Sequence, residues 1–298
     1  NGSISTSTTL GTTTANSKGA FSFTPSSVLE DGNYSIKATA TDDAGNISSK
    51  SASISITIDT TAPDAPTSLS TSSSITNNST PTITGNAEPS SKVTLFIDSS
   101  LLGTTTASTK GAFSFTPASA IEDGNYLIKA TATDSAGNLS SKSSSISITI
   151  DTTAPDAPSS VATSSSITNN STPTITGNAE ADSIITLLNG DIVLGTATTD
   201  SEGAFSITPS AALADGDYSL EAKATDSAGN ISSESSSISI TIDTSAPDAP
   251  TSLATASTDT NDTTPTISGT AEADSTITLL NGIIVLGTAS TDSEGAFS

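Results

Sequence analysis

The sequence predicts an all-β chain of tandem sandwich domains arranged linearly, and three observations support this prediction. The segment Ile-Asp-Thr-Thr-Ala-Pro-Asp-Ala-Pro recurs every 92 residues, at Ile58, at Ile150 and, with one Thr→Ser change, at Ile242. Between the copies, apolar and polar residues alternate over short segments, as in strands with one buried face. No segment shows the period of an amphipathic helix. A repeat of this length fits one sandwich domain of about 100 residues.

The proline-rich segment that closes each copy serves as the domain boundary. It divides the chain into two complete repeats and two partial ones, and we expect the chain to be a segment of a longer repetitive protein. The predicted domains are a C-terminal part of a repeat at 1–58, complete repeats at 59–150 and 151–242, and an N-terminal part at 243–298.

The first half of repeat 151–242 predicts three strands. Apolar residues alternate with threonines over 173–177, and then along a second segment that contains Ile185 and Leu187. Asn189-Gly190 follows and is a strong hairpin signal. The third strand is expected over 193–199. Each of these segments has one apolar face, so each is expected to cover a common core.

The second half of the repeat predicts three more strands and the fold. Residues 204–207 place Phe205 and Ile207 on one face, 218–224 alternate from Tyr218, and 238–242 carry three isoleucines. Tyr218 follows an Asp-Gly turn, where an immunoglobulin-like sandwich has a tyrosine whose hydroxyl bonds back to the main chain. We therefore predict immunoglobulin-like Greek-key β-sandwich domains of about seven strands each.

The aromatic residues are expected to be structural. Tyr34 and Tyr126 match Tyr218 in the other copies, and the pairs Phe21/Phe23 and Phe113/Phe115 are predicted to lie in the cores. Alternation places Phe96 outward. It is the only candidate for an exposed aromatic platform that could bind a glycan, which is the alternative reading of the chain as a binding module.

The composition excludes several functions. The chain has no His, Cys, Met or Trp, and its net charge is −23. It therefore lacks an imidazole base and a thiol nucleophile. The charge opposes binding to nucleic acid, and no run of about 18 apolar residues predicts insertion into a membrane. Paired carboxylates for glycoside hydrolysis remain, but an enzyme does not need the same loop every 92 residues, so we expect no catalysis.

Several strings together resemble bacterial Ig-like repeats of giant surface adhesins and biofilm-associated proteins exported by type I secretion. They are Thr-Pro-Thr-Ile-Thr-Gly-Asn-Ala-Glu (172–180), Leu-Gly-Thr (194–196), Gly-Ala-Phe-Ser (203–206), Asp-Gly-Asp-Tyr (215–218), Ala-Thr-Asp-Ser-Ala-Gly-Asn (224–230) and the Ile-Asp-Thr-Ser-Ala-Pro linker. The resemblance implies a secreted, extracellular protein at the bacterial cell surface. It also implies an extender that holds an adhesive domain away from the cell, with structural Ca²⁺ stiffening the joints between domains.

The acidic residues lie in loops that an immunoglobulin-like fold gathers where consecutive repeats meet. Calcium takes six to eight oxygen ligands and accepts this mixture of carboxylates and amides. Asp and Asn are also common turn residues on a solvated surface, which is the alternative explanation. The candidate ligands are Asp31, Asp59, Asp64, Glu88, Asp134 and Asn138 at the first joint, Asp123, Asp151, Asp156, Glu180, Asp226 and Asn230 at the second, and Asp215, Asp243, Asp248 and Glu272 at the third.

The expected function is a structural extender in adhesion or biofilm, whose partners are the neighbouring repeats of the same chain. The alternative is a segment of an extracellular fibre, in which copies associate laterally or end to end through exposed edge strands. Strong self-repulsion at a net charge of −23 means that such packing would also need cations.

Overall fold

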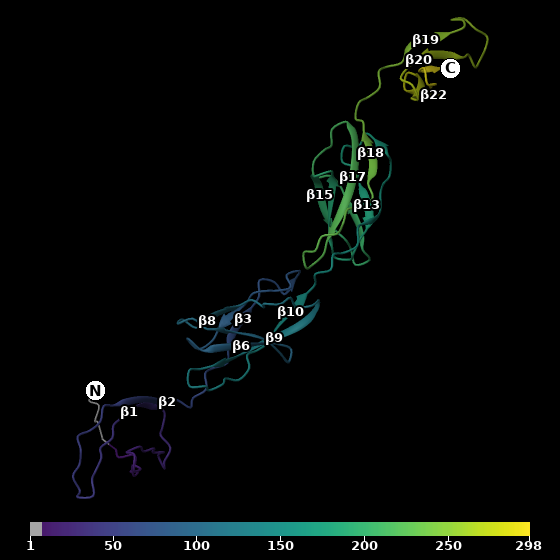
Figure 1. Cartoon of the computed structure of the whole chain (residues 1–298). Coiled ribbons are helices and arrows are strands. Elements are labelled where there is room, and N and C mark those ends of the chain that lie inside the picture. Colours follow the sequence, from purple (N-terminus) through teal and green to yellow (C-terminus); the bar gives the residue numbers. More distant parts are fainter. Residues whose placement is uncertain (1–7) are drawn as a thin grey trace. The chain divides into compact units, whose positions relative to one another are not determined.

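The computed structural model describes residues 8–298 and is built from strands (Figure 1). The chain divides into two compact units. One ends at Thr153 and also includes Ser227–Asn230, and the other comprises Ala154–Asp226 and Ile231–Ser298. Within residues 8–298 there is no helix that could span a lipid bilayer. The all-β prediction is confirmed.

The repeat at 59–150 forms two sheets. Its strands are β3 (Thr67–Ser70), β4 (Ile75–Thr76), β5 (Ile83–Asn86), β6 (Lys92–Ile97), β7 (Ser100–Thr106), β8 (Ala112–Phe115), β9 (Gly124–Thr133) and β10 (Ile146–Ile150). One sheet has the order β3-β5-β8 and the other β4-β10-β9-β6-β7. All pairs are antiparallel except β4 with β10, which is parallel.

The repeat at 151–242 has the same topology. Its strands are β11 (Ser159–Thr163), β12 (Ile167–Thr168), β13 (Ile175–Asn178), β14 (Ile184–Asn189), β15 (Ile192–Thr198), β16 (Ala204–Ile207), β17 (Gly216–Thr225) and β18 (Ile238–Ile242). The sheets are β11-β13-β16 and β12-β18-β17-β14-β15. Each complete repeat thus has eight strands, against about seven predicted. The individually predicted segments did not include β3 and β11, or the two-residue strands β4 and β12, which are too short to show a period.

The flanking parts form fewer strands. Residues 8–58 contain the antiparallel pair β1 (Gly32–Ile36) and β2 (Ile54–Ile58). Residues 243–298 contain β19 (Thr251–Thr255), β20 (Ile267–Thr270), β21 (Thr276–Asn281), β22 (Ile284–Ser290) and β23 (Ala296–Phe297). Phe21 and Phe23, predicted to be core residues, are 62% and 38% exposed, because no second sheet covers them among the described residues.

The core of each complete repeat contains the residues that the alternation selected. In the repeat at 151–242 these residues are fully or almost fully buried: Ile175, Ile185, Leu187, Phe205, Ile207, Leu220, Ala222, Ala224, Ile240 and Ile242. Phe205 lies against its cross-strand partner Gly177, where an added Cβ would stand 2.5 Å from the ring. Glycine is therefore required at this position by close packing. Phe113 is buried in the same way beside Gly85.

The tyrosine corner is confirmed, and the hairpin turn is found one residue away from its predicted place. The tyrosine hydroxyls donate to main-chain carbonyls four residues upstream, Tyr34 to Glu30 (2.8 Å), Tyr126 to Glu122 (3.0 Å) and Tyr218 to Ala214 (2.9 Å). The hairpin turn falls one residue later than the Asn-Gly pair predicts. Asn189 pairs with Ile192, which leaves Gly190 and Asp191 in the turn, and Gly190 has φ +57°.

Candidate functional site

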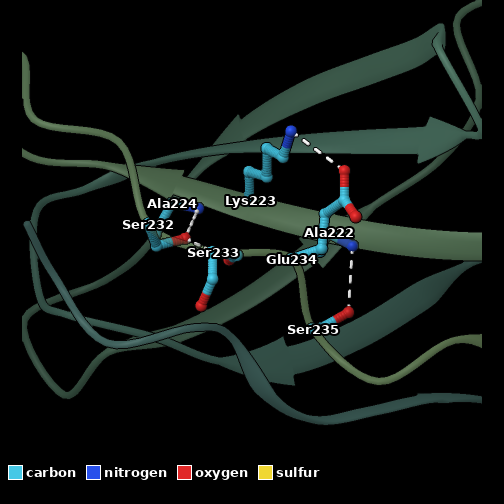
Figure 2. A network of polar contacts seen from close by, with 7 residues as sticks. All are labelled: Ala222, Lys223, Ala224, Ser232, Ser233, Glu234 and Ser235. Atoms are coloured by element: carbon cyan, nitrogen blue, oxygen red, sulfur yellow. Dashed lines mark hydrogen bonds and ion pairs between the residues drawn. The ribbon is translucent and has the colours of Figure 1, made fainter.

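A serine network holds the segment between the last loop and the last strand of each repeat (Figure 2). Ser232 Oγ accepts a hydrogen bond from the main-chain N–H of Ala224 (2.9 Å), and Ser235 Oγ accepts one from Ala222 (3.0 Å). Lys223 forms an ion pair with Glu234 at 3.0 Å. These hydroxyls replace main-chain carbonyls at the edge of β17, so a segment without strand geometry is bonded to the sheet.

The same network recurs in the other copies. Ser140 and Ser143 bind Ala132 and Ala130, as Ser48 and Ser51 bind Ala40 and Ala38. Sequence reasoning missed these serines because the chain is rich in serine and threonine throughout. The spacing Ser-Ser-x-Ser, repeated every 92 residues, is the signal that could have identified them.

The first joint, Asp59–Asp64, is held by the carboxylate of Asp31. Asp31 Oδ1 accepts hydrogen bonds from the N–H and the hydroxyl of Thr60 (3.0 and 2.8 Å). Its Oδ2 accepts from the Thr61 hydroxyl (2.9 Å). Hydrogen bonds from the hydroxyls of Thr60 and then Thr61 lower the pKa of Asp31 below its ordinary value. The segment before β1 therefore fixes the first two residues after Asp59.

We call the contact of Asp31 with Thr60 and Thr61 the aspartate clasp, and the same clasp occurs after each of the two complete repeats. Asp123 binds Thr152 and Thr153, and Asp215 binds Thr244 and Ser245. The hydroxyl of Thr152 is the main cause of the lowered pKa of Asp123, and that of Thr244 is the main cause for Asp215. The Thr→Ser change in the third copy keeps the hydroxyl that this contact uses.

A second group of the predicted residues meets the first joint from the repeat that follows it. Asn138 Nδ2 donates to the main-chain carbonyl of Asp59 (3.0 Å) and to Asp134 Oδ2 (2.8 Å). The amide hydrogen bond from Asn138 is the main cause of a lowered pKa at Asp134. The structure thus brings Asp59, Asp134 and Asn138 together by direct hydrogen bonds.

The remaining candidate ligands are not gathered into an acidic cluster. In residues 8–298 no three acidic side chains lie close enough together to hold a metal ion. At the first joint, Asp64 and Glu88 therefore do not complete such a group with Asp31 or Asp59. Whether Ca²⁺ binds these joints stays a prediction.

At the second joint, Asp151 and Asp123 belong to the first compact unit. Asn230 Nδ2 donates to the main-chain carbonyl of Asp151 (2.8 Å). Asp156, Glu180 and Asp226 belong to the second unit, where the Glu180 carbonyl accepts hydrogen bonds from Ser183 and Thr199 (2.7 Å each).

At the third joint, Asp243 Oδ1 accepts from the N–H of Ser245 (3.0 Å), beside the Asp215 clasp. The Glu272 carbonyl accepts from the Thr291 hydroxyl (2.7 Å). Asp248 is exposed and, like the others, is part of no group of three acids among the described residues.

Phe96 lies on the outer face of its sheet and is partly exposed. The Lys142 ammonium stands 4.9 Å from the ring centroid, which is cation–π distance. The ring face that a sugar would need is thus covered by this chain's own lysine.

Comparison with protein families identifies the domain: the family model of the bacterial Ig-like domain matches residues 3–60, 61–152 and 153–244. The chain belongs to the bacterial Ig-like domain family. The boundaries between the matches, at 60/61 and 152/153, fall within the proline-rich joints. The three copies together cover most of the chain.

Individual proteins are similar to this bacterial Ig-like chain over different extents. Exoglucanase B of Cellulomonas fimi is 31% identical over 235 residues, which is 75% of this chain and 21% of the enzyme. A tetra-tandem repeat from the extending region of a large adhesion protein is 24% identical and covers 90% of this chain and 72% of its own, with a TM-score of 0.30. A 1.5-MDa bacterial ice-binding adhesin is 21% identical, with coverage of 72% and 74% and a TM-score of 0.31. The chain spans about a fifth of the length of the exoglucanase.

Proposed function

We propose that this chain is a non-catalytic extender segment of a large bacterial adhesion protein at the cell surface. The family model matches three tandem copies in this chain, and recurring hydrogen bonds from threonine and serine hydroxyls to Asp31, Asp123 and Asp215 hold the chain at each joint. The function is mechanical: the chain sets a distance and transmits force between whatever flanks it.

The observation that carries this proposal is where the chain enters and leaves a repeat. In the repeat at 59–150, β9 pairs through Gly124 with Ile150, the last residue of β10, so the chain leaves at the Gly124 end. It enters at Asp59, whose carbonyl is bonded by Asn138, just beyond the Thr133 end of β9. These points lie at the two ends of a ten-residue strand, whose length is roughly 33 Å. Each repeat in series therefore adds length.

The proposed role of calcium is to add stiffness at the joints. The chain has 31 acidic residues against eight lysines and arginines combined. Acidic residues on both sides of a joint repel one another unless a cation lowers the repulsion. Ca²⁺ is the cation that carboxylates, carbonyls and amides of this kind would bind, and Asp59, Asp64 and Glu88 retain oxygens for it.

Small-angle scattering tests the extender directly. The full chain is compared with a variant that lacks residues 59–150. An extended series predicts that the maximum dimension falls by about 33 Å or more. If the full chain and the shortened variant were each one compact body, their radii of gyration would differ by only about 2–3 Å. A difference that small would overturn the proposal.

The calcium component has a separate test on the same samples. Scattering and thermal unfolding are repeated in EDTA and in excess Ca²⁺. A smaller maximum dimension and a lower melting temperature in EDTA support bound calcium. Unchanged values remove calcium from the account and leave the extender in place.

A second candidate, lateral association into a fibre, is favoured by the edge strands β7 and β15. They carry no charged residue, and Leu101, Ile192 and Val193 are more than half exposed. A β-bulge at Leu194, whose carbonyl is bonded by the N–H of Ser210 (2.7 Å), opposes continuous pairing there. Sedimentation at rising concentration and calcium decides: a concentration-dependent increase in mass supports the fibre, and a constant monomer mass excludes it.

A further inference from the structure

The lysines of the chain are concentrated in its first half. Residues 1–150 contain seven lysines and 11 acidic residues, whereas residues 151–298 contain one lysine and 20 acidic residues. The net charge of −23 is therefore carried mainly by the second half. Contact between the first half of one copy and the second half of another meets less repulsion than contact between two second halves.

Three lysines gather over the outer face of one sheet in the repeat at 59–150. Lys92 and Phe96 lie on the same face of β6, and Phe96 is paired with Lys129 of β9. The Lys142 ammonium lies 4.9 Å from the centre of the Phe96 ring. Lys92 and Lys142 are exposed, and Lys129 is partly exposed. We call these three lysines the lysine face.

The corresponding face of the repeat at 151–242 is acidic. Glu221 of β17 stands 92 residues after Lys129, and it is partly exposed. Glu234 stands 92 residues after Lys142, and it is exposed. Asp217 is exposed on the same face of β17 and adds a third carboxylate. We call Asp217, Glu221 and Glu234 the acidic face. The charge of this sheet face is thus opposite in the two complete repeats.

The lysine face forms no ion pair among the residues that the structure describes. The one ion pair within residues 8–298 joins Lys223 to Glu234 at 3.0 Å (Figure 2). Over the same range, Asp217 and Glu221 form none. Three ammonium groups on one repeat and two carboxylates on the other are therefore available to a second copy of the chain.

The size of the two faces indicates a weak and reversible contact. In the repeat at 59–150, β10, β9, β6 and β7 are neighbours, and β9 is ten residues long. Four strands about 4.8 Å apart and roughly 33 Å long form a face of about 600 Å². Two such faces bury about 1,200 Å² in total, which is the lower end for a specific interface between proteins.

We propose that the lysine face of one copy of the chain binds the acidic face of another copy. Each contact uses the repeat at 59–150 from one copy and the repeat at 151–242 from the other. An acidic polysaccharide would also attract the lysines, but it gives no reason for acidic residues at the equivalent positions 92 residues later. The contact goes beyond the extender function, and it uses sheet faces instead of the edge strands β7 and β15.

Charge reversal in two separate full-length chains tests the contact. The variant Lys129→Glu with Lys142→Glu carries acidic residues on both faces, and the variant Glu221→Lys with Glu234→Lys carries lysines on both. Sedimentation measures the association of the parent, of each variant alone and of their equimolar mixture. EDTA removes divalent cations that could bridge carboxylates. At 0.1 M salt the Debye length is about 10 Å, so distant charges are screened and contacting groups still interact.

We expect the mixture to associate with an apparent dissociation constant at least tenfold lower than that of either variant alone. The reason is that only the mixture brings faces of opposite charge together. A mixture that associates no more than its components would overturn the proposal. Hydrogen exchange across β9 and β17 verifies that both variants are folded. Failure here leaves the scattering result, and hence the extender function, unaffected.

Two further measurements separate the contact from simpler effects of charge. Lys18→Glu with Lys110→Glu makes the same change in net charge at two exposed turn positions away from the lysine face. This control should associate as the parent does, and an effect as large as that of Lys129→Glu with Lys142→Glu would overturn the proposal. Polygalacturonate is the probe for an acidic polysaccharide. If it binds the parent through Lys129 and Lys142 while the mixture of variants stays unassociated, the lysine face serves a glycan and the proposal is overturned.

Discussion

The two complete repeats carry different residues at one buried position, Thr199 in the second and Ala107 in the first. In the repeat at 151–242, the Thr199 hydroxyl donates to the Glu180 carbonyl (2.7 Å) and accepts from the N–H of Ser183 (2.9 Å). In the repeat at 59–150 the equivalent residue is Ala107. There Ser91 Oγ is buried and has no hydrogen-bond partner within the part of the chain that the structure describes.

Two substitutions exchange these arrangements. Thr199→Ala removes two hydrogen bonds at a residue that is only 4% exposed. Each such bond contributes about 0.5–1.5 kcal/mol, so the expected loss of stability is about 2 kcal/mol. The reciprocal change, Ala107→Thr, supplies a partner for Ser91 and is expected to add about 1 kcal/mol.

Native-state hydrogen exchange with mass spectrometry measures both changes, because peptides from the two repeats differ in sequence and report separately. Thr199→Ala should speed exchange in β14 and β17 by roughly 30-fold and leave β6 and β9 unchanged, since 1.4 kcal/mol is a factor of ten. Ala107→Thr should slow exchange in β6 and β9 about fivefold. If both substitutions shift stability in the same direction, the hydrogen-bond explanation is refuted.

Three further predictions concern packing, the serine network and the clasp. Gly177→Ala forces a methyl group against the Phe205 ring and should lower the stability of that repeat by about 1–3 kcal/mol, measured as a lower urea midpoint; no change would contradict the close packing. Ser235→Ala leaves the N–H of Ala222 without its bond, and should cost about 1–3 kcal/mol in hydrogen exchange; retained protection would show that the network is dispensable. Because the pKa of Asp123 is lowered in the folded chain, its clasp contributes above the ordinary aspartate pKa of about 3.9 and is lost as pH falls through the lower folded value. Amide shifts in the second joint followed by NMR from pH 7 to 2 should move in that acid range, and an Asp123→Asn variant should abolish the transition.

Much of the fold follows from periodicity. Ile185 and Leu187 have a period of two, and the Asp-Gly turn before Tyr218 places that residue at a corner, so each position is determined by local pattern. The strands β4 and β12 could not be predicted, since two residues in parallel pairing leave no period. Phe21 and Phe23 were misassigned because core position depends on a covering sheet and not on the strand that carries the residue.

The joint residues were predicted as calcium ligands, which stays a prediction, and the structure adds hydrogen bonds that the sequence did not reveal. Asn138 and Asn230 were selected for their amide oxygens, and their side-chain N–H groups donate to the carbonyls of Asp59 and Asp151. Asparagine carries both a donor and an acceptor, so residue type alone does not decide between them. Asp31 was likewise selected as a ligand, and the structure shows it accepting from Thr60 and Thr61. Long-range contacts of this kind depend on the fold, which local sequence does not reveal.

Single-molecule stretching of the full chain by its two ends tests the central claim, that the repeats bear load in series. Each complete repeat holds 92 residues, which extend to roughly 300–330 Å when unfolded, against roughly 33 Å along a folded strand. The account predicts two discrete unfolding events, each releasing about 270–300 Å of chain by these estimates. Smooth extension without discrete events, or a single event for both repeats, would contradict it.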